Sequence, residues 1–164
     1  MAAKKSAQKG EGESGARVVD VNKKARHDYE IISTAEAGIV LTGSEVKSIR
    51  QNGVSLRDSY VRMKGTECYL VGAHVAPYAF AGLNAHEPYR ERKLLLHRRE
   101  IERLGAQVQT KGLTLIPLRI YFNPKGRCKL EIGVGRGKKL HDKRQDQKAK
   151  EARRDMERAL RTRE

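Results

Sequence analysis

The sequence predicts a mainly β protein with short helices, in which about six strands form a small closed or partly closed barrel followed by a basic tail. Three observations carry this prediction. Short runs of alternating apolar and polar residues are separated by turns that contain Gly or Pro. Two stretches have helical rather than alternating spacing. Residues 135–164, finally, contain almost nothing apolar to bury.

A chain of 164 residues fits one domain with extensions. Residues 1–21 mix Ala, Lys, Gly, Ser and Glu without a period, which predicts a disordered N-terminal extension. Residues 22–134 are the predicted barrel. Residues 135–164 are the basic C-terminal tail, which we expect to be disordered when free and to fold to a helix on binding.

The first predicted elements are two short strands and a helix. The runs 29–32 and 39–41 are rich in β-favouring residues and flank a polar turn at 33–38. Thr42 and Glu45 then have the spacing of a capping box, in which each side chain accepts from an otherwise unpaired backbone N–H. They predict a short helix directly after the second strand.

The middle of the chain predicts a hairpin, a loop and a second helix. Residues 58–64 alternate as a half-buried strand does, and a Gly-Thr turn leads back into the run 68–71. No period is visible over 77–92, where Gly, Asn and Pro indicate a surface loop. Residues 98–104 have helical spacing and predict a second short helix.

Two long strands complete the predicted barrel. The run 113–122 is interrupted by Pro117, which cannot donate to a strand ladder and so predicts a sheet edge or a bulge. The Asn-Pro-Lys-Gly sequence at 123–126 is typical of a β-turn. Alternation from Cys128 to Val134 then predicts the last strand.

The charge balance predicts a polyanionic partner. The net charge is +15, the pI is about 10.1 and the mean hydropathy is −0.72. Self-repulsion of this size is costly without a partner of opposite charge, and nucleic acid is the commonest such partner. A membrane surface would require large apolar residues in a basic helix. The chain has no Trp and only two Phe, neither of them in the tail, so we expect no membrane partner. It also has no long apolar run and no signal peptide, so we expect a cytoplasmic protein.

Catalytic and metal-binding motifs are missing from the sequence. Cys68 and Cys128 lie far apart, and the five His residues form no spaced ligand set. The glycines of 133–137 resemble a phosphate loop only superficially, because Lys138 is followed by Lys139 rather than Ser or Thr. We therefore expect no enzyme activity, no metal and no cofactor, and we interpret these glycines as a joint between barrel and tail.

Basic residues cluster at three places that could form one phosphate-facing surface. These are the stretch 22–27, the pair Lys47 and Arg50 on the first predicted helix, and the stretch 90–93. Each phosphate that such a surface neutralises releases counterions, so affinity would fall steeply with salt. The alternative, in which the clusters are scattered solvated faces, stays open at this point.

Aromatic and imidazole side chains near these clusters could stack on unpaired bases, as some barrel proteins do with RNA. The candidates are His27, Tyr78, Phe80 and Tyr89. Packing in the core or within a loop is an equally good interpretation of each aromatic residue. Composition alone does not distinguish RNA from DNA.

The tail has a weak helical pattern. A narrow apolar stripe recurs at helical spacing at Ala149, Ala152, Met156 and Leu160. Asp146–Lys150 and Glu157–Arg161 have i,i+4 spacing in the better orientation, worth roughly 0.3–0.5 kcal/mol each. A lone helix is marginal in water, so we expect this segment to become helical against a polyanion that relieves its self-repulsion.

Four sequence blocks together resemble a known family. They are NKKARHDYEI, EAGIVLTGSEVKSIRQNGVSLRDSYV, RKLLLHRREI and IGVGRGKKLHDKR, in that order from Asn22 onward. They resemble the small protein B family, the SsrA-binding proteins of bacteria. The resemblance implies an OB-like barrel with flanking helices. It also implies a non-enzymatic adaptor of trans-translation that binds the tRNA-like domain of transfer-messenger RNA (tmRNA, or SsrA RNA) and reaches stalled ribosomes with elongation factor Tu.

The resemblance and the basic clusters together assign two sets of site residues. The expected RNA-binding residues are Asn22, Lys23, Lys24, Arg26, His27, Glu36, Gly38, Lys47, Arg50, Arg92, Lys93 and Leu95. The residues expected at the ribosomal decoding centre, formed by 16S rRNA, and along the empty mRNA channel are Gly137, Lys138, Lys139, His141, Asp142, Lys143, Arg144, Lys148, Lys150, Arg153 and Arg154. In this picture His141 stacks on a ribosomal base.

Glu36 is acidic on a surface expected to be basic. It could accept a hydrogen bond from a base edge, or it could orient Arg26 or Lys47; a solvated turn residue is the plainer interpretation. Two other protein classes also compete with the adaptor, namely a structural ribosomal protein and a DNA-binding architectural protein with a basic tail. The adaptor interpretation expects no DNA partner.

Overall fold

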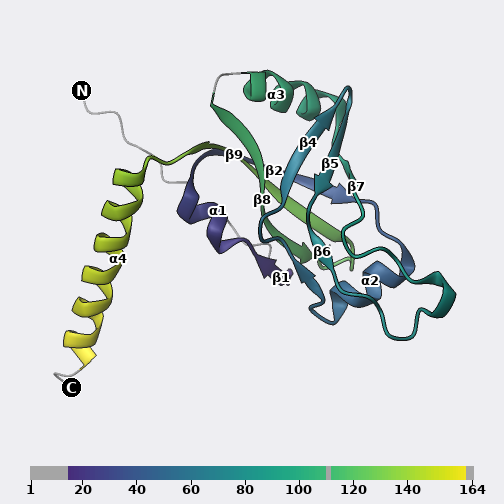
Figure 1. The fold of residues 1–164 in the computed structure, drawn as a ribbon, viewed down its shortest axis with the longest axis horizontal. Helices are drawn as coiled ribbons and strands as arrows, with labels where there is room; N and C mark the ends of the chain where they lie inside the picture. The colour runs from purple at the N-terminus through teal and green to yellow at the C-terminus, as the bar shows by residue number, and fades with distance from the viewer. Residues whose placement is uncertain (1–14, 110–111, 162–164) are drawn as a thin grey trace.

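The computed structural model describes residues 15–109 and 112–161 as one large antiparallel sheet, a two-stranded sheet and the helices around them (Figure 1). The large sheet contains β1 (Arg17–Val21), β2 (Tyr29–Ile39), β4 (Tyr60–Lys64), β5 (Glu67–Val71), β7 (Arg92–Leu95), β8 (Leu113–Phe122) and β9 (Cys128–Gly137). The small sheet contains β3 (Val54–Ser55) and β6 (His74–Val75). The helices are α1 (Lys23–Asp28), α2 (Gly43–Arg50), the 3-10 helix η1 (Gly82–Asn84), α3 (Arg98–Gln109) and α4 (Leu140–Arg161).

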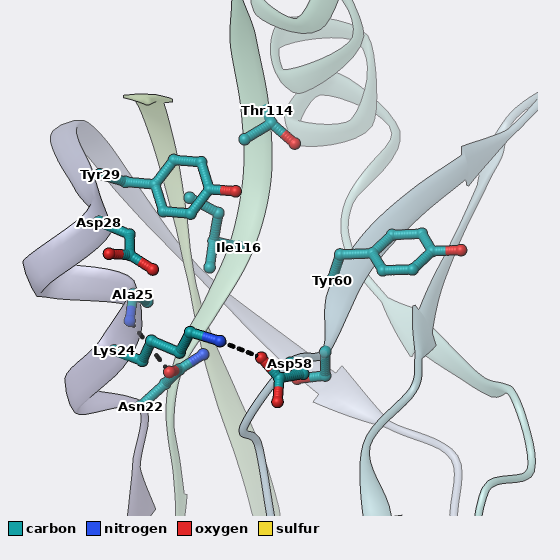
Figure 2. Close-up of a pocket in the computed structure, with 10 residues that line it drawn as sticks. Asn22, Lys24, Ala25, Asp28, Tyr29, Asp58, Tyr60, Thr114 and Ile116 are labelled. Atoms are coloured by element: carbon teal, nitrogen blue, oxygen red, sulfur yellow. Dashed lines mark hydrogen bonds and ion pairs between the residues drawn. The ribbon is translucent and has the colours of Figure 1, made fainter. Parts of the chain in front are cut away.

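The large sheet curls but does not close. Its strand order is β1-β8-β9-β2-β7-β5-β4, and although β4 lies close to β8, no strand pairing joins them. The mainly β class with short helices is confirmed. Of the predicted closed or partly closed barrel, the closed form is wrong, because the sheet does not close. The cause is the outer edge of β8, where the backbone N–H of Asn22 donates to the Leu118 carbonyl (2.8 Å) and its side chain to the Pro117 carbonyl (3.1 Å). Helix α1 therefore covers this edge, and Figure 2 shows the pocket left between α1 and β4.

Strand β1 corrects the predicted N-terminal boundary. Residues 17–21 pair with β8, with Arg17 opposite Phe122, so they are not a disordered extension. The Asp20 carboxylate also accepts a hydrogen bond from the Leu56 N–H at 2.8 Å. The stretch 17–21 contains a short run of Val residues among polar ones, a weak strand signal in the sequence, and its pairing with β8 is what orders it. Residues 1–14 lie outside the described part of the chain.

Strand β2 is longer than expected. The segment 33–38, predicted as a turn, continues the strand and pairs with β9 after a register shift between Ile31 and Ser33. Ala35 and Ala37 are buried while Glu36 between them is exposed, which is the alternation of a half-buried strand. Local β-propensity is low there, so the long pairing with β9 decides the conformation.

The other predicted elements are found with modest changes. Helix α2 has the complete capping box of Thr42 and Glu45. Strands β4 and β5 form the predicted hairpin. The predicted bulge in β8 is confirmed by the register shift between Pro117 and Arg119, although β8 lies inside the sheet between β1 and β9. Helix α3 runs past its predicted end.

The core lies on the inner face of the curled sheet, where α2 and α3 cover it. Buried Ile49 from α2 and Leu104 from α3 pack with sheet residues such as Leu94 and Ile132. A second, smaller cluster is formed where Ala25 of α1 packs against β8. This second cluster fixes α1 on the sheet, and with it the basic residues that α1 carries.

The C-terminal segment differs from the expectation of a tail that is disordered when free. Residues 140–161 form the helix α4, which stands apart from the sheet and contributes no buried residue (Figure 1). The predicted glycine joint instead belongs to β9, which continues to Gly137 and so moves the boundary beyond residue 134. No described helix has the length and apolar character that crossing a membrane requires.

Candidate nucleic-acid interface

The expected RNA-binding residues fall into two groups on the structure. One group lies on α1, between the sheet and α4 (Figure 1). The other lies on β2, α2 and β7. Two of the expected residues, Asn22 and Arg92, are buried and serve the fold instead.

Asn22 holds α1 in place. Its Oδ1 accepts from the Ala25 N–H at 3.1 Å, which caps the helix, and its Nδ2 donates to the carbonyls of Leu56 and Pro117. With only 6% of its surface exposed, this side chain has its hydrogen bonds satisfied inside the protein. In this conformation Asn22 is used within the protein, where it positions α1.

The exposed cations of α1 form the first basic patch. Lys23 and Arg26 are exposed, and Arg26 lies in the last turn, where a positive charge suits the helix dipole. Lys24 reaches across the pocket to Asp58, with 2.5 Å between Nζ and Oδ1 (Figure 2). Three adjacent lysines and arginines on one short helix can meet phosphates.

His27 is tied to its neighbour Asp28. Because a carboxylate can only accept, the ring donates from Nδ1 to Asp28 Oδ1 at 3.0 Å. Its Nε2 is buried and has no hydrogen-bond partner within the described residues. The bond from His27 lowers the pKa of Asp28 against the opposing effect of burial, and Lys143 of α4 lowers it further. Asp28 thus joins α1 to the start of α4.

The second group centres on Glu36, Gly38 and Leu95. Gly38 of β2 stands opposite Leu95 of β7, and a Cβ on Gly38 would lie 3.3 Å from the Leu95 Cβ. Glycine therefore leaves room for Leu95, which is 54% exposed. With Lys129 these residues line a shallow groove on the outer face of the sheet.

Glu36 has partners that the sequence did not suggest. The Tyr121 hydroxyl donates to Glu36 Oε2, and Lys129 Nζ lies 3.4 Å from Oε1. Arg26 and Lys47, the two expected partners, are not the ones it meets. Lys129 was visible in the alternation of the last strand, but the register that brings it beside Gly38 follows only from sheet topology. We add Tyr121 and Lys129 to the candidate site for this reason.

The remaining cations of the second group sit on α2 and β7. Lys47 Nζ lies 5.5 Å from the Tyr78 ring centroid, and the Arg50 guanidinium lies 5.6 Å from that of Phe122. Lys93 is about half exposed and forms an ion pair with Glu67. Exposed cations that lie over aromatic rings are held in place without losing their charge.

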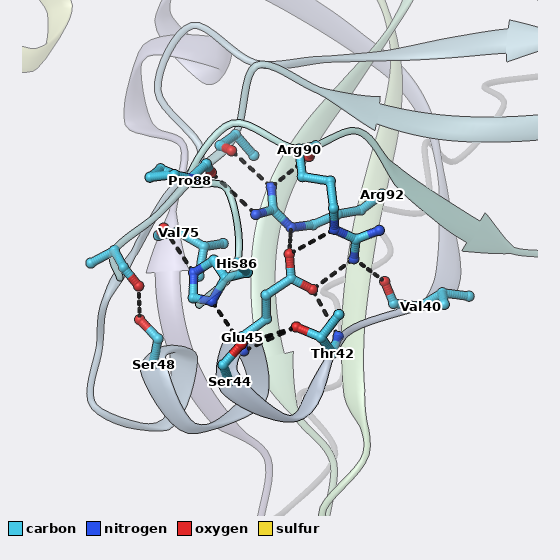
Figure 3. A network of polar contacts seen from close by, with 12 residues as sticks. Val40, Thr42, Ser44, Glu45, Ser48, Val75, His86, Pro88, Arg90 and Arg92 are labelled. Carbon is cyan, nitrogen blue, oxygen red and sulfur yellow. Dashed lines mark hydrogen bonds and ion pairs between the residues drawn. The ribbon is translucent and has the colours of Figure 1, made fainter. Parts of the chain in front are cut away.

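Arg92 belongs to a buried network rather than to the surface (Figure 3). It is fully buried, with Nε 2.9 Å from Glu45 Oε1 and with further bonds to the carbonyls of Ala73, Arg90 and Pro88. In this conformation none of the surface of Arg92 is available to a partner. Its basic neighbours in sequence concealed this, since sequence alone does not tell which Arg of a cluster points inward.

Glu45 is the centre of this network. It is fully buried and accepts from Arg92, from Arg90 at 2.7 Å and from the Thr42 N–H at 2.8 Å. Burial acts to raise the pKa of Glu45, but the bonds from Arg90 and Thr42 and the charge of Arg92 outweigh it and hold that pKa below its ordinary value. Burial lowers the pKa of Arg92 in turn, and Glu45 opposes this.

Gly137, Lys138 and Lys139 lead from β9 into α4, and the other tail residues lie along this helix. Its start is fastened to α1: Lys143 Nζ is 3.2 Å from Asp28 Oδ1, and Lys138 pairs with Asp146 at 2.5 Å and donates from its backbone to the Asp28 carbonyl. The tail residues that the structure leaves exposed are Gly137, Lys139, His141, Asp142, Arg144, Lys148, Lys150, Arg153 and Arg154. The helix thus presents cations along its whole length.

The described residues contain no group of three or more His, Cys, Asp or Glu placed to hold a metal ion. Cys68 is buried, and burial raises the pKa of the partly buried Cys128 thiol to about 12. Both thiols are therefore protonated near neutral pH and pack as apolar groups.

A family model, curated relatives and a solved structure all match this chain to SmpB or SsrA-binding proteins. A family model described as SmpB protein matches residues 19–162. An SsrA-binding protein of Oleidesulfovibrio alaskensis is 54% identical and aligns over 90% of this chain and 94% of its own. Another SsrA-binding protein, from a Roseiflexus species, is 58% identical over 90% of this chain and 93% of its own. Among solved structures, a chain from "tmRNA-SmpB: a journey to the center of the bacterial ribosome" aligns with a TM-score of 0.64 and 48% identity, over 76% of this chain and 86% of that one.

Proposed function

The chain belongs to the SmpB family, and we propose that it is a non-enzymatic RNA-binding adaptor that binds the tRNA-like domain of SsrA RNA and brings it to stalled ribosomes. The observation that carries this proposal is the match to SsrA-binding proteins over about nine-tenths of the chain, the tail included. A net charge of +15 supports a polyanionic partner.

The proposed RNA surface lies on the body of the protein. Its first part is the basic patch of α1, and its second part is the groove of Glu36, Gly38 and Leu95 with Lys129. The cations would neutralise phosphates and so position the RNA, while Glu36 would accept from a base edge. Since Lys129 already partly neutralises Glu36, the acid does not repel the RNA as an isolated carboxylate would.

The tail has a separate role in this proposal. The decoding-centre contacts would come from Gly137 to Arg144, with His141 stacking on a base of 16S rRNA. The later cations of α4 would follow the mRNA channel, which is free of mRNA when a ribosome stalls at a message end. Exposure of most of these residues in the structure supports this role; Lys138 and Lys143, which pair with Asp146 and Asp28, are partly buried. Elongation factor Tu is the proposed partner during delivery.

The direct test is to recover the tagged protein from cells and sequence the RNA bound to it. SsrA RNA should be enriched far above its cellular share, together with a smaller amount of ribosomal RNA. Enrichment of bulk ribosomal RNA or of genomic DNA, with no tRNA-like species, would falsify the proposal. Those results would favour a structural ribosomal protein or a DNA-binding protein.

A further inference from the structure

The loop between β6 and β7 presents aromatic side chains to solvent, although its base is rigidly held. Phe80 is 84% exposed, and its ring packs edge-on against Tyr78 with 5.7 Å between centroids. Lys47 of α2 lies over the other ring, that of Tyr78. These three side chains, with Asn84, line a hollow between the loop and the start of α2.

The base of this loop is fastened by the buried network of Figure 3. His86 donates from Nε2 to the Val75 carbonyl at 3.2 Å, since a carbonyl can only accept, and its Nδ1 meets the Ser44 hydroxyl at 3.0 Å. Arg92 donates to the Pro88 carbonyl at 3.1 Å. These bonds hold the two ends of the loop, and the contacts of Tyr78 with Phe80 and Lys47 position its rings between them.

The chemistry of the hollow fits an unpaired nucleotide. Its described lining contains one cation and no acid. An exposed ring beside a cation offers a stacking face for a base and a partner for the adjoining phosphate, and the Asn84 amide can both donate to and accept from a base edge. A protein partner would need a larger apolar surface than Phe80 offers here.

The position of the hollow indicates which RNA would fill it. The hollow and a second depression adjoin along α2: Lys47 lines the hollow, while Val46, the preceding residue of the helix, lines that depression with Gly38 and Leu95. The second depression shares Gly38, Leu95 and Lys129 with the groove on the sheet. An RNA lying on the sheet face would need only to cross α2 to reach it.

We propose that Phe80, with Tyr78, Lys47 and Asn84, forms a binding pocket for one unpaired nucleotide of the SsrA RNA that is bound on the adjacent sheet face. This inference rests on the proposed function and adds a stacking site to it. The site reads a base by its ring face, so it contributes affinity that does not depend on charge.

The test compares two exposed residues of the same loop in the full-length protein. Phe80→Ala should weaken binding of the tRNA-like domain of SsrA RNA about 5- to 150-fold, the range found when a stacking aromatic is removed. The slope of log affinity against log salt should not change, because no phosphate contact is lost. Leu83→Ala is the matched control: Leu83 is fully exposed on η1 but does not line the hollow, so affinity should stay within about twofold.

A second arm locates the nucleotide. Abasic substitutions at each unpaired position of the RNA should reveal one position where removal of the base weakens binding to the unmodified protein. At that position the same substitution should have no effect on Phe80→Ala. Phe80 is exposed, so thermal unfolding of the variant should match that of the unmodified protein.

Several outcomes would overturn the inference. Binding of SsrA RNA by Phe80→Ala at unchanged affinity would do so, as would an equal loss in Leu83→Ala. A variant that binds SsrA RNA normally but loses association with ribosomes would show that the hollow has another occupant. If the unmodified protein itself fails to bind SsrA RNA, the proposed function is contradicted as well. If it binds SsrA RNA with the same affinity as Phe80→Ala, only the proposed pocket is contradicted.

Discussion

The body and the tail of this protein carry positive charge in different ways. On the body, several cations are held by nearby acids or rings: Arg92 by buried Glu45, Lys24 by Asp58, and Lys47 over an aromatic ring. On α4, the described cations beyond the first turns are exposed, and some of them pair with acids of the same helix, as Arg153 does with Glu157 at 3.3 Å. The cations held on the body therefore have fixed positions, whereas the exposed cations of α4 are presented along a helix that stands apart from the sheet (Figure 1).

The largest expected effect is on stability: loss of a buried carboxylate should cost far more free energy of unfolding than loss of an exposed one. Glu45→Ala leaves Arg92 buried without its carboxylate partner, and we expect the free energy of unfolding to fall by about 3–5 kcal/mol. Urea denaturation measures this. The matched control on the tail is Glu151→Ala, an exposed position of α4, which should change stability by no more than about 0.5 kcal/mol. Equal effects of the two changes would remove the contrast between body and tail.

The lowered pKa of Glu45 makes the stability of the protein depend on pH. The pKa of Glu45 is lower in the folded protein than its ordinary value, which is about 4.3 in an unfolded chain. Its contribution is therefore complete above that ordinary value and is lost as the pH falls through the lower folded value. Denaturation midpoints measured from neutral pH downward should fall in this acid window. In Glu45→Gln that part of the decline should be absent, and an unchanged curve would contradict the role of Glu45.

A smaller effect tests whether α4 stands alone. Ala152→Gly should weaken this helix by about 1 kcal/mol, because glycine is a poor helix former. Far-UV circular dichroism should show less helix, while the unfolding midpoint of the body stays the same. A chain that ends at Gly137 gives the baseline signal without α4. A lower midpoint in Ala152→Gly would mean that the helix stabilises the body.

The smallest effect concerns the contact between the two regions. Asp28→Asn removes the charge that holds Lys143, which we expect to cost roughly 0.2–1 kcal/mol for a partly exposed pair. Hydrogen exchange at the first turns of α4 should become faster. Asp58→Asn is the matched control, since it frees Lys24 on α1 without touching the tail. Identical exchange in the two variants would show that Asp28 does not fasten α4.

Much of the fold could be predicted because local signals were strong. The capping box of Thr42 and Glu45 and the bulge at Pro117 each have a local physical cause, and both are present in the structure. The strand over 33–38 could not be predicted, because its conformation comes from pairing with β9 rather than from its own residues. Barrel closure failed for a similar reason, since Asn22 covers the edge of β8 through contacts distant in sequence.

The candidate site was predicted less evenly. Lys23, Arg26 and Leu95, expected to contact RNA, are exposed, whereas Asn22 and Arg92 are buried. Sequence patterns identify basic clusters without telling which member points inward. Lys129, beside Glu36, could not be placed before the register of β2 and β9 was known. Burial and register are properties of the whole sheet, and no short stretch of sequence contains them.

The separation of roles between body and tail is tested most directly by the RNA affinity and tagging activity of a chain that ends at Gly137. We predict that this chain binds the tRNA-like domain of SsrA RNA nearly as tightly as the full-length protein, because α4 buries none of its residues against the body. We also predict that tagging of nascent chains on messages without a stop codon is abolished. Loss of RNA affinity on truncation, or normal tagging without α4, would contradict this account.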